Sequence, residues 1–594
     1  MALILDVECY KDYFLICFLD RESNKVASFD MFDGQRLAVA KVSNLMRSRQ
    51  TISFNGNHYD LPMIEAALQG RDCEELKTLS DEIITSGKPS WRVCREEGIN
   101  IPQAWDHIDI IDVVPGRASL KVYAGRLGYP KLQDLPIEPS ASISVAEREL
   151  LRKYCVNDLR VTNELYKAVE KQVALRVEMS AEYDVDLRSK SDAQIAETVL
   201  RSEVENATGK TLRVPKVNDD ATFRYLDPKI VEFKGDQLRK VITLLTSHPF
   251  DLSGNGSIKM PDWLKNTKIK IGDGEYQMGV GGLHSCEKAQ SVYAGTDHIL
   301  ADFDVASYYP SIILQQDIAP DSMGDSFTRV YQSIVDRRIK AKRAGDKVTA
   351  DTLKIVVNGS FGKLGSKYST LYAPNLLIQT TITGQLALLM LIERVEAVGA
   401  KVVSANTDGI VVLAHKSLEP DLAQVMFDWE LDTSYELERS DYRSLHSRDV
   451  NNYIAVKPDG ATKRKGAFSQ AGLMKNPQFE IVSDAVAAHL AGTADYKDVI
   501  RTCKDLNKFV MLRKVTGGAV WRDQKLGKAV RFYYSTDVGP DETINYDKNS
   551  NKVPQSDGAK PCLDLPEQLP DDIDFERYVG MTHMVFKQIG VTLA

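Results

Sequence analysis

The chain has 594 residues, of which 43% are apolar and 27% charged, a composition typical of soluble globular proteins with several domains. Its apolar runs are too short to span a bilayer and its first residues carry acids, so neither a membrane protein nor a secreted one is expected. The formal net charge is −8, and eight scattered cysteines include no Cys-x-x-Cys pair, which excludes metal sites built on such pairs and suits a reducing cytoplasm.

The first part of the chain has the pattern of an α/β domain. Short apolar runs at 2–7 and 13–19 predict neighbouring strands, and strands then alternate with helical stretches up to about residue 185. Residues 186–290 are polar and mixed, and we interpret them as connecting structure.

The remaining chain returns to regular patterns. Strand-like runs occupy 298–314 and 401–413, and between them two helices are predicted at 326–344 and 348–358, separated by a turn. A basic segment at 508–534 precedes an acidic tail that we expect to end in a helix near 574–588.

Four carboxylates in the first domain form the first candidate site. Asp6 and Glu8 alternate on the first strand and therefore point to one face, where their like charges favour a bound cation. Tyr154 and Asp158 are one helical turn apart, and Asp60 follows a strand-like segment. Such acids suit two Mg²⁺ or Mn²⁺ ions that hydrolyse a phosphodiester; unrelated surface acids are the alternative.

The order Asp-x-Glu, Asn-x-x-x-Tyr-Asp at 55–60 and Tyr-x-x-x-Asp resembles the motifs of DEDDy 3′–5′ proofreading exonucleases. The resemblance implies that the four acids bind metal, that Tyr154 orients the attacking water, and that Asn55 contacts single-stranded DNA. His107, Asp109 and Asp112 are interpreted as capping or surface groups.

A second candidate site begins at Asp304, which follows an apolar run and starts the sequence Asp-Val-Ala-Ser-Tyr-Tyr-Pro-Ser-Ile-Ile. A buried strand with a capping Asp is the alternative reading. The string resembles motif A of family B DNA polymerases. That resemblance implies that Asp304 and the carbonyl of Val305 bind metal, and that Tyr309 lies under the sugar of the incoming nucleotide and excludes a 2′-hydroxyl.

Residues 354–362 resemble the fingers motif Lys-x-x-x-Asn-Ser-x-Tyr-Gly of the same family, with Gly for Ser and Phe for Tyr. Helical spacing places Lys354 and Asn358 on one face, and upstream Arg338 and Lys342 are also four residues apart. These side chains are expected to bind the triphosphate; a solvated basic helix is the alternative.

Residues 404–409 resemble motif C, Tyr-x-Asp-Thr-Asp-Ser, with departures that include two of its polar positions. Asn406 replaces the first Asp and Gly409 replaces the Ser. The resemblance assigns metal binding to Asp408 beside Asp304, with two ions per active site, while Asn406 contributes no charge.

Weaker patterns indicate DNA contacts. Gly281 and Gly282 stand where the family carries Tyr-x-Gly-Gly. Tyr453 occupies the Lys-x-Tyr position, with Asn451 in place of the Lys, and the basic run 463–465 downstream is a candidate source of the missing charge.

The segment 508–534 combines seven cations with interleaved aromatic residues and is interpreted as a thumb that holds the duplex. Lys514 and Arg522 are its candidate DNA-binding residues. A solvated basic hairpin is the alternative.

The resemblance implies an α/β and α+β multidomain chain, with an RNase H-like exonuclease followed by a right-hand polymerase. The expected boundaries are 1–185 for the exonuclease, 186–290 for the connecting region, 291–325 and 364–470 for the palm, 326–363 for the fingers, and 471–594 for the thumb and C-terminal tail. We expect primer–template DNA, deoxynucleotides and, in the exonuclease site, single-stranded DNA as partners of a monomer. A compact phage replicase in the host cytoplasm, helped by phage accessory proteins and without a membrane, is the expected setting.

Two alternatives to a primer-extending polymerase stay open. One is a protein-primed or primer-independent polymerase of the same family, although the 54 residues between Asp304 and Asn358 leave little room for an insertion. The other is a DNA-binding factor with a decayed polymerase site, for which Asn406 is the support.

Overall fold

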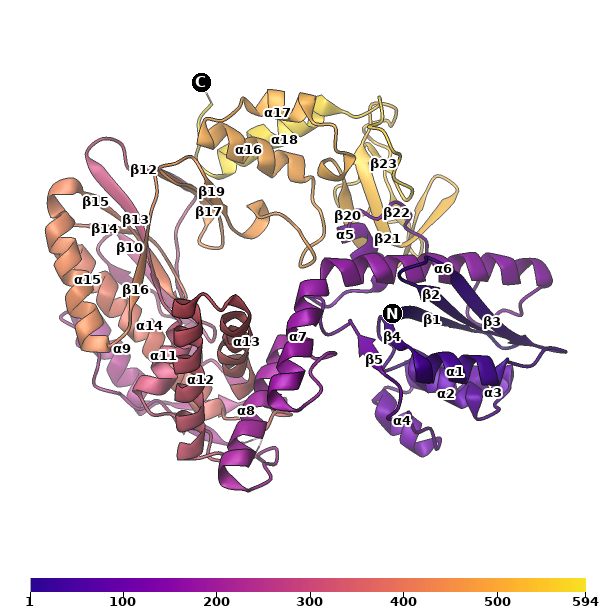
Figure 1. Cartoon of the computed structure of the whole chain (residues 1–594). Coiled ribbons are helices and arrows are strands. Elements are labelled where there is room, and N and C mark those ends of the chain that lie inside the picture. The colour runs from indigo at the N-terminus through magenta and orange to yellow at the C-terminus, as the bar shows by residue number, and fades with distance from the viewer. Residues whose placement is uncertain (1, 219, 594) are drawn as a thin grey trace. The chain divides into compact units, whose positions relative to one another are not determined.

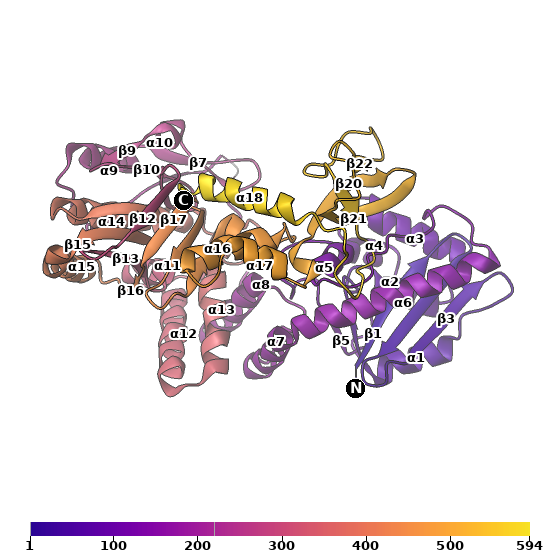
Figure 2. The ribbon, with the colours of Figure 1, turned by 90° about the horizontal axis from the view of Figure 1, so that it is seen from above.

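The computed structural model describes residues 2–218 and 220–593, which form two compact units. The first unit comprises the chain up to Ser191 together with Gln470–Ile481 and Cys503–Arg577. The second comprises Asp192–Ser469, Val482–Thr502 and the chain from Tyr578 onward. Figure 1 shows the elements of both units in chain order, and Figure 2 shows them from above.

The first unit is built on a five-stranded sheet in the order β3-β2-β1-β4-β5. β1 is antiparallel to β2 and parallel to β4, so the carboxyl ends of β1 and β4 lie at one edge of the sheet. The strands are β1 (Ala2–Cys9), β2 (Tyr13–Asp20), β3 (Val26–Phe32), β4 (Gln50–Ser53) and β5 (His107–Asp109).

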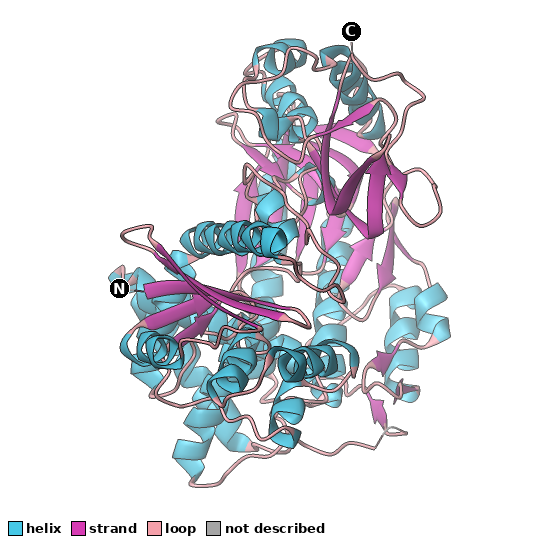
Figure 3. Cartoon of the chain, turned by 90° about the vertical axis from the view of Figure 1, so that its right-hand side faces the viewer, coloured by secondary structure: helices cyan, strands magenta, loops and turns pink. Residues whose placement is uncertain are grey.

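Both faces of this sheet are covered by helices, with α6 on one face and α1 to α4 on the other (Figure 3). Alternate residues of β1 divide between two cores, because Leu3 and Leu5 pack with the smaller helices while Ile4 packs with α6. Asp6 and Glu8 continue the series of Ile4 and therefore face α6. The helices are α1 (Val39–Ser48), α2 (Asp60–Leu68), α3 (Cys73–Thr85), α4 (Ser90–Glu96), α5 (Leu120–Arg126), α6 (Val145–Ala168) and α7 (Glu170–Tyr183).

A second sheet in the first unit has the order β22-β20-β21-β23. Its long hairpin packs on α5, and Leu512 lies so close to Gly125 that a side chain there would overlap it. The strands are β20 (Met511–Trp521), β21 (Gln524–Tyr534), β22 (Asn545–Tyr546) and β23 (Ala559–Pro561). The segment expected to form a thumb is thus part of the unit that contains the exonuclease motifs.

The second unit is built on a seven-stranded sheet in the order β16-β13-β15-β14-β11-β10-β9. Every pairing in it is antiparallel. The strands are β9 (Ile269–Ile271), β10 (Gly274–Met278), β11 (Leu283–Ser285), β13 (His298–Val305), β14 (Lys401–Asn406), β15 (Gly409–His415) and β16 (Leu437–Asp441). Since β9 to β11 belong to this sheet, much of 186–290 is integral to the second unit.

Helix α14 (Pro374–Ala397) packs with α11 (Tyr308–Gln315) and α15 (Glu419–Thr433) in the main core of the second unit. It is the one helix among the described residues that is long and apolar enough to cross a membrane, but 83% of its most apolar stretch is buried within the protein. Burial inside the core accounts for its composition.

The two helices predicted between the strand-like runs are confirmed as α12 (Asp325–Ala344) and α13 (Lys347–Leu364). Asp346 caps α13 by accepting the N–H of Thr349 (3.1 Å). Helix α8 (Asp192–Thr208) packs against α13, and a Cβ at Gly359 would lie 2.8 Å from the carbonyl oxygen of Asp192. Gly replaces Ser at this motif position because the two helices approach closely here.

Smaller elements complete the chain. A four-stranded sheet in the order β12-β17-β18-β19 lies in the second unit, and the helix predicted near 574–588 is confirmed as α18. The bounds are β6 (Thr222–Arg224), β7 (Pro249–Leu252), β8 (Ile258–Lys259), β12 (Gln290–Tyr293), β17 (Ser444–Asp449), β18 (Asn452–Val456), β19 (Thr462–Arg464), α9 (Asp236–Ser247), α10 (Asp262–Asn266), α16 (Glu480–Ala491), α17 (Tyr496–Thr502) and α18 (Phe575–Gln588).

Candidate active sites

The acids of the first constellation meet between β1 and α6. Asp6, Glu8 and Cys155 each bring a possible ligand atom within 4.8 Å of the others. The thiol of Cys155 lies 3.7 Å from Oδ2 of Asp6, and the backbone N–H of Val7 donates to Oδ1 of Asp60 (3.1 Å). Strand periodicity accounts for the common face of Asp6 and Glu8, whereas Cys155 was not among the residues predicted for this site.

Asp158 is bound by a residue that the motifs did not reveal. The ammonium of Lys121, at the start of α5, contacts both carboxylate oxygens of Asp158 and lies 4.2 Å from the centre of the Tyr154 ring. The sequence around Lys121 contains no motif that we recognised, and only the packing of α5 on α6 brings it to the acids.

Burial raises the pKa of all four carboxyls in this site, that of Asp60 to about 7. The other acids raise the pKa values of Asp6 and Glu8 further, whereas Lys121 lowers them. A set of carboxylate oxygens that repel one another in a buried site fits hard divalent cations such as Mg²⁺ or Mn²⁺.

The loop that carries Asn55 is held by Asp109. The carboxylate of Asp109 accepts the backbone N–H groups of Asn55 (2.8 Å) and Asn57 (3.0 Å), which confirms its interpretation as a capping group. Interpreting His107 as a surface or capping group was wrong, since it is buried between the hydroxyls of Thr51 and Ser53.

The acids of the second constellation meet at the end of the seven-stranded sheet. Asp304 pairs with Gly409 across β13 and β15, and the N–H of Val305 donates to the carbonyl oxygen of Asp408 (2.7 Å). A Cβ at position 409 would lie 2.3 Å from Oδ1 of Asp304. Gly409 replaces the Ser of motif C, and the neighbouring carboxylate in this position leaves no space for a side chain there.

A cavity of about 1070 Å³ opens beside these acids. It brings together the two candidate metal ligands and all the predicted nucleotide-binding side chains. Its wall includes Asp304, Val305, Tyr309, Arg338, Lys342, Lys354, Asn358, Phe361, Asp408, Glu436 and Glu438. The two glutamates, on or just before β16, were not identified from sequence, because only the pairing of β16 with β13 places them here.

Tyr309 is fixed on two sides. Its ring stacks on Phe361 with the ring centres 4.0 Å apart, and its hydroxyl donates to the carbonyl oxygen of Gly281 (2.7 Å). Gly282 lies against Thr407, since a Cβ there would come within 2.9 Å of the Thr407 side chain. The glycine loop thus supports both motif A and motif C.

The cations of the cavity face two acids with raised pKa. Arg338 donates to the Ser307 hydroxyl (3.1 Å), whereas Lys342 and Lys354 line the cavity. Burial is the main cause that raises the pKa of Asp304 and of Asp408. Carboxylates facing positive side chains form a donor set that suits divalent cations together with a polyphosphate.

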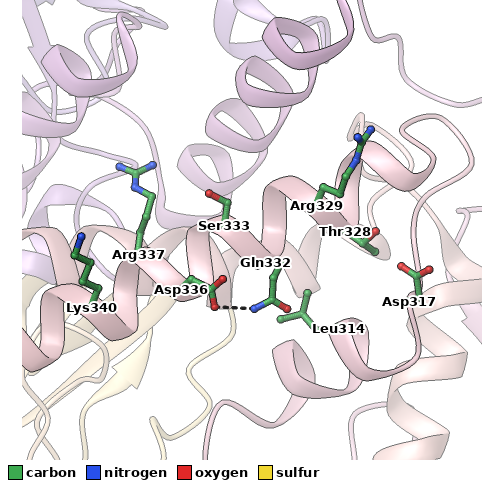
Figure 4. A pocket seen from close by; sticks show the side chains of 9 residues that line it. All are labelled: Leu314, Asp317, Thr328, Arg329, Gln332, Ser333, Asp336, Arg337 and Lys340. Carbon is green, nitrogen blue, oxygen red and sulfur yellow. Dashed lines mark hydrogen bonds between the residues drawn. The ribbon is translucent and has the colours of Figure 1, made fainter.

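A separate cavity of about 590 Å³ lies along α12 and contains none of the predicted site residues (Figure 4). Arg329, Arg337 and Lys340 line it, and the amide of Gln332 donates to Asp336 (2.8 Å). The cations of α12 are therefore divided between this surface and the larger cavity.

The remaining candidate DNA-binding residues lie on separate elements. Tyr453 lies on β18, and Lys514 is exposed on β20. Arg522, at the turn of the β20–β21 hairpin, pairs with Glu542 (2.7 Å) and lies 4.1 Å from the centre of the Trp521 ring.

Comparisons with known proteins point in the same direction as the motifs. No model of a known protein family matches the chain. It is 22% identical over 306 residues to a DNA polymerase of Archaeoglobus fulgidus, which covers 44% of this chain and 38% of the relative. It is 24% identical over 269 residues to DNA polymerase 1 of Sulfolobus acidocaldarius, which covers 41% of this chain and 29% of the relative. The chain thus spans less than two-fifths of the length of either relative.

Among solved structures, the family B DNA polymerase of Pyrobaculum calidifontis aligns with 100% of this chain and 78% of its own, at 13% identity and a TM-score of 0.41. The sequence similarity to archaeal DNA polymerases agrees with the ordered motifs. In its ordered motifs the chain resembles the DNA polymerases of family B, and the curated relatives that it matches are DNA polymerases.

Proposed function

We propose that the chain is a DNA-templated DNA polymerase that extends a primer 3′-hydroxyl and carries a 3′–5′ proofreading exonuclease. The observation that supports the polymerase most strongly is the cavity in which Asp304 and Asp408 face Tyr309, Lys354 and Arg338. These residues come from motif A, motif C and the two fingers helices, and a decayed site would not be expected to keep them together.

In the polymerase site, Asp304, Asp408 and the carbonyl of Val305 would hold divalent cations. Such ions, when bound, activate the 3′-hydroxyl and neutralise the triphosphate. Lys342 and Lys354 bind the phosphates and offset the charge that develops on the leaving pyrophosphate. The Tyr309 ring lies under the deoxyribose and excludes ribonucleotides by its bulk.

In the exonuclease site, Asp6, Glu8, Asp60 and Asp158 form the metal-binding set, and Tyr154 orients the attacking water. Lys121 neutralises Asp158 and lies close enough to stabilise the developing negative charge of the phosphate. Asn55 contacts the unpaired 3′ strand. The palm, fingers and thumb boundaries and the DNA-binding roles of Tyr453, Gly281, Gly282, Lys514 and Arg522 are part of the same proposal.

The test is a 5′-labelled primer on a longer DNA template with Mg²⁺, with and without the four deoxynucleotides. Extension is expected with nucleotides and 3′ shortening without them. Asp304→Asn should abolish extension and leave shortening, whereas the double variant Asp6→Ala, Glu8→Ala should do the reverse.

Each other outcome has a definite meaning. DNA binding without either reaction would overturn the proposal in favour of a binding factor, and extension without a primer would favour the primer-independent alternative. The phage setting, the host cytoplasm and accessory proteins are retained only as part of the proposal, since the curated relatives come from archaea.

A further inference from the structure

An ion pair lies directly beside Asp304. The ammonium of Lys463, on β19, donates to Oδ2 of Asp302 (2.9 Å) and lies 3.6 Å from Oδ2 of Asp304. The hydroxyl of Tyr442 donates to the same oxygen of Asp302 (2.5 Å). The Asp302 side chain is only 6% exposed, whereas that of Lys463 is 31% exposed and therefore accessible to a ligand.

Asp302 would disturb the metal-binding acid if it were unpaired. Residues two apart on a strand point to one face, so the negative charges of Asp302 and Asp304 repel each other beside Lys463. Lys463 compensates for the charge of Asp302. The ammonium donates to Asp302, lies 3.6 Å from Asp304 and is partly exposed, so an anion that binds next to Asp304 can contact it.

A neutral pair stands nearby where the family pattern has charges. Asn406 stands where motif C has an Asp, and Asn451 stands where the Lys-x-Tyr pattern has its Lys. Nδ2 of Asn406 lies 3.5 Å from Oδ1 of Asn451. Asp302 and Lys463 supply one acid and one base beside Asp304.

We propose that Lys463, held by Asp302 and Tyr442, binds the phosphodiester backbone at the 3′ end of the primer in place of the missing Lys at position 451. Tyr453 lies on the neighbouring strand, where Ala455 pairs with Lys463. Asp302 is a positioning residue, which keeps the ammonium off Asp304 so that Asp304 stays available to metal. This inference rests on the proposed polymerase function.

The experiment compares Lys463→Ala, Lys463→Arg, Asp302→Asn and the double variant Asp302→Asn, Lys463→Ala in the exonuclease-deficient background. Lys457→Ala, in the turn after β18, is the matched control because it removes an exposed cation from the same sheet. Primer–template affinity is measured at several salt concentrations without nucleotides, and the Mg²⁺ requirement is measured from extension rates. Thermal unfolding reports on any structural damage.

Loss of one charged phosphate contact should weaken primer–template affinity about tenfold in Lys463→Ala. It should also reduce the slope of log affinity against log salt by about one. Lys463→Arg should keep the slope, and Lys457→Ala should match the parent. Asp302→Asn should keep the slope but raise the Mg²⁺ requirement for extension, because the freed ammonium moves onto Asp304.

The double variant separates binding from structure. With both charges removed, it should show the reduced slope of log affinity against log salt and the same Mg²⁺ requirement as the parent. This result is expected even if Lys463→Ala alone is unstable. An unchanged slope in a folded Lys463 variant, with extension intact in the parent, would overturn this inference and leave the proposed function standing. No extension by the parent protein would overturn the proposed function itself.

Discussion

At the scale of single residues, two departures from the family motifs have packing reasons. Gly409 makes room for the carboxylate of Asp304, and Gly359 makes room for the backbone of α8. Asn406 is different, because it forms polar contacts with its neighbours Thr407 and Asn451. The local sequence of the polymerase site is therefore adapted to its own surroundings.

Tyr309 leads to a prediction about sugar selection. Tyr309→Ala should lower the preference for deoxynucleotides over ribonucleotides roughly 10- to 100-fold, because the ring that collides with a 2′-hydroxyl is removed. Tyr309→Phe keeps the ring stacked on Phe361 and loses only the bond to Gly281, so it should retain the preference. The ratio of kcat/KM values for the two nucleotide types measures both. Equal selectivity in the Ala variant would contradict the role.

The buried acids of the exonuclease site predict a dependence on pH. Burial raises the pKa of all four carboxyls, that of Asp60 to about 7, so the folded, metal-free site holds a proton on Asp60 below that pH. If Mg²⁺ must displace one proton in order to bind, its affinity rises about tenfold for each pH unit, as long as the pH is below that pKa. The Mg²⁺ concentration that half-saturates 3′ shortening should therefore fall between pH 6 and pH 8. A constant value would show that the site binds metal without losing protons.

The raised pKa values of these carboxyls also determine how the stability of the fold changes with pH. A carboxyl whose folded pKa is raised stabilises the fold at low pH, and this contribution is lost as the pH rises through the folded value. For Asp60 that loss runs from about pH 4, near its unfolded pKa, to about pH 7, its folded pKa. Added Mg²⁺ should consequently raise the unfolding temperature of the first unit more at pH 8 than at pH 6. Replacing Asp60 with Asn should remove much of that difference.

At the scale of elements, a buried cation helps to attach the β20–β21 hairpin to the rest of the first unit. Arg531 is fully buried and donates to four backbone carbonyls, those of Tyr129, Pro130, Cys562 and Leu563. Burial is the main cause that lowers the pKa of Arg531 to about 10, and Cys562 and Asp564 oppose it only in part. The guanidinium therefore joins three segments that are distant in sequence.

Arg531→Met should destabilise the first unit by about 3 kcal/mol, because it leaves buried carbonyls without donors. Urea unfolding of this unit, and proteolysis of the hairpin under native conditions, measure the change. Lys514→Met on the neighbouring strand is the control, since it removes an exposed cation. A loss no greater than that of the control would contradict the role of Arg531.

At the scale of the whole molecule, an acidic chain is proposed to bind a polyanion. The net charge of −8 coexists with a cavity that holds Arg338, Lys342 and Lys354 and with a second basic surface along α12. Local fields, not the total charge, determine whether DNA binds.

Affinity for primer–template should therefore depend steeply on salt. For six or more phosphate contacts, it should fall by about a thousandfold between 50 and 200 mM salt. Fluorescence anisotropy with a labelled duplex measures the slope, and unlabelled heparin should compete. A slope near zero would contradict binding through the phosphate backbone.

The sequence by itself determined the local relations in this protein. The period of a strand placed Asp6 and Glu8 on one face, and that of a helix placed Lys354 and Asn358 together, because both relations depend only on the backbone within a few residues. The order of the motifs predicted two active sites on the same basis. The mixed α/β, multidomain class followed from the alternation of such segments.

Only the tertiary structure decided which distant segments meet. Lys121 reaches Asp158, Lys463 reaches Asp302, and Glu438 lies opposite Asp304, although no local pattern relates these positions. It also placed the hairpin of residues 511–534 in the unit of the exonuclease motifs. Such pairings depend on which buried surfaces fit together across the whole chain, and a charged residue shows its partner only when the packing is complete.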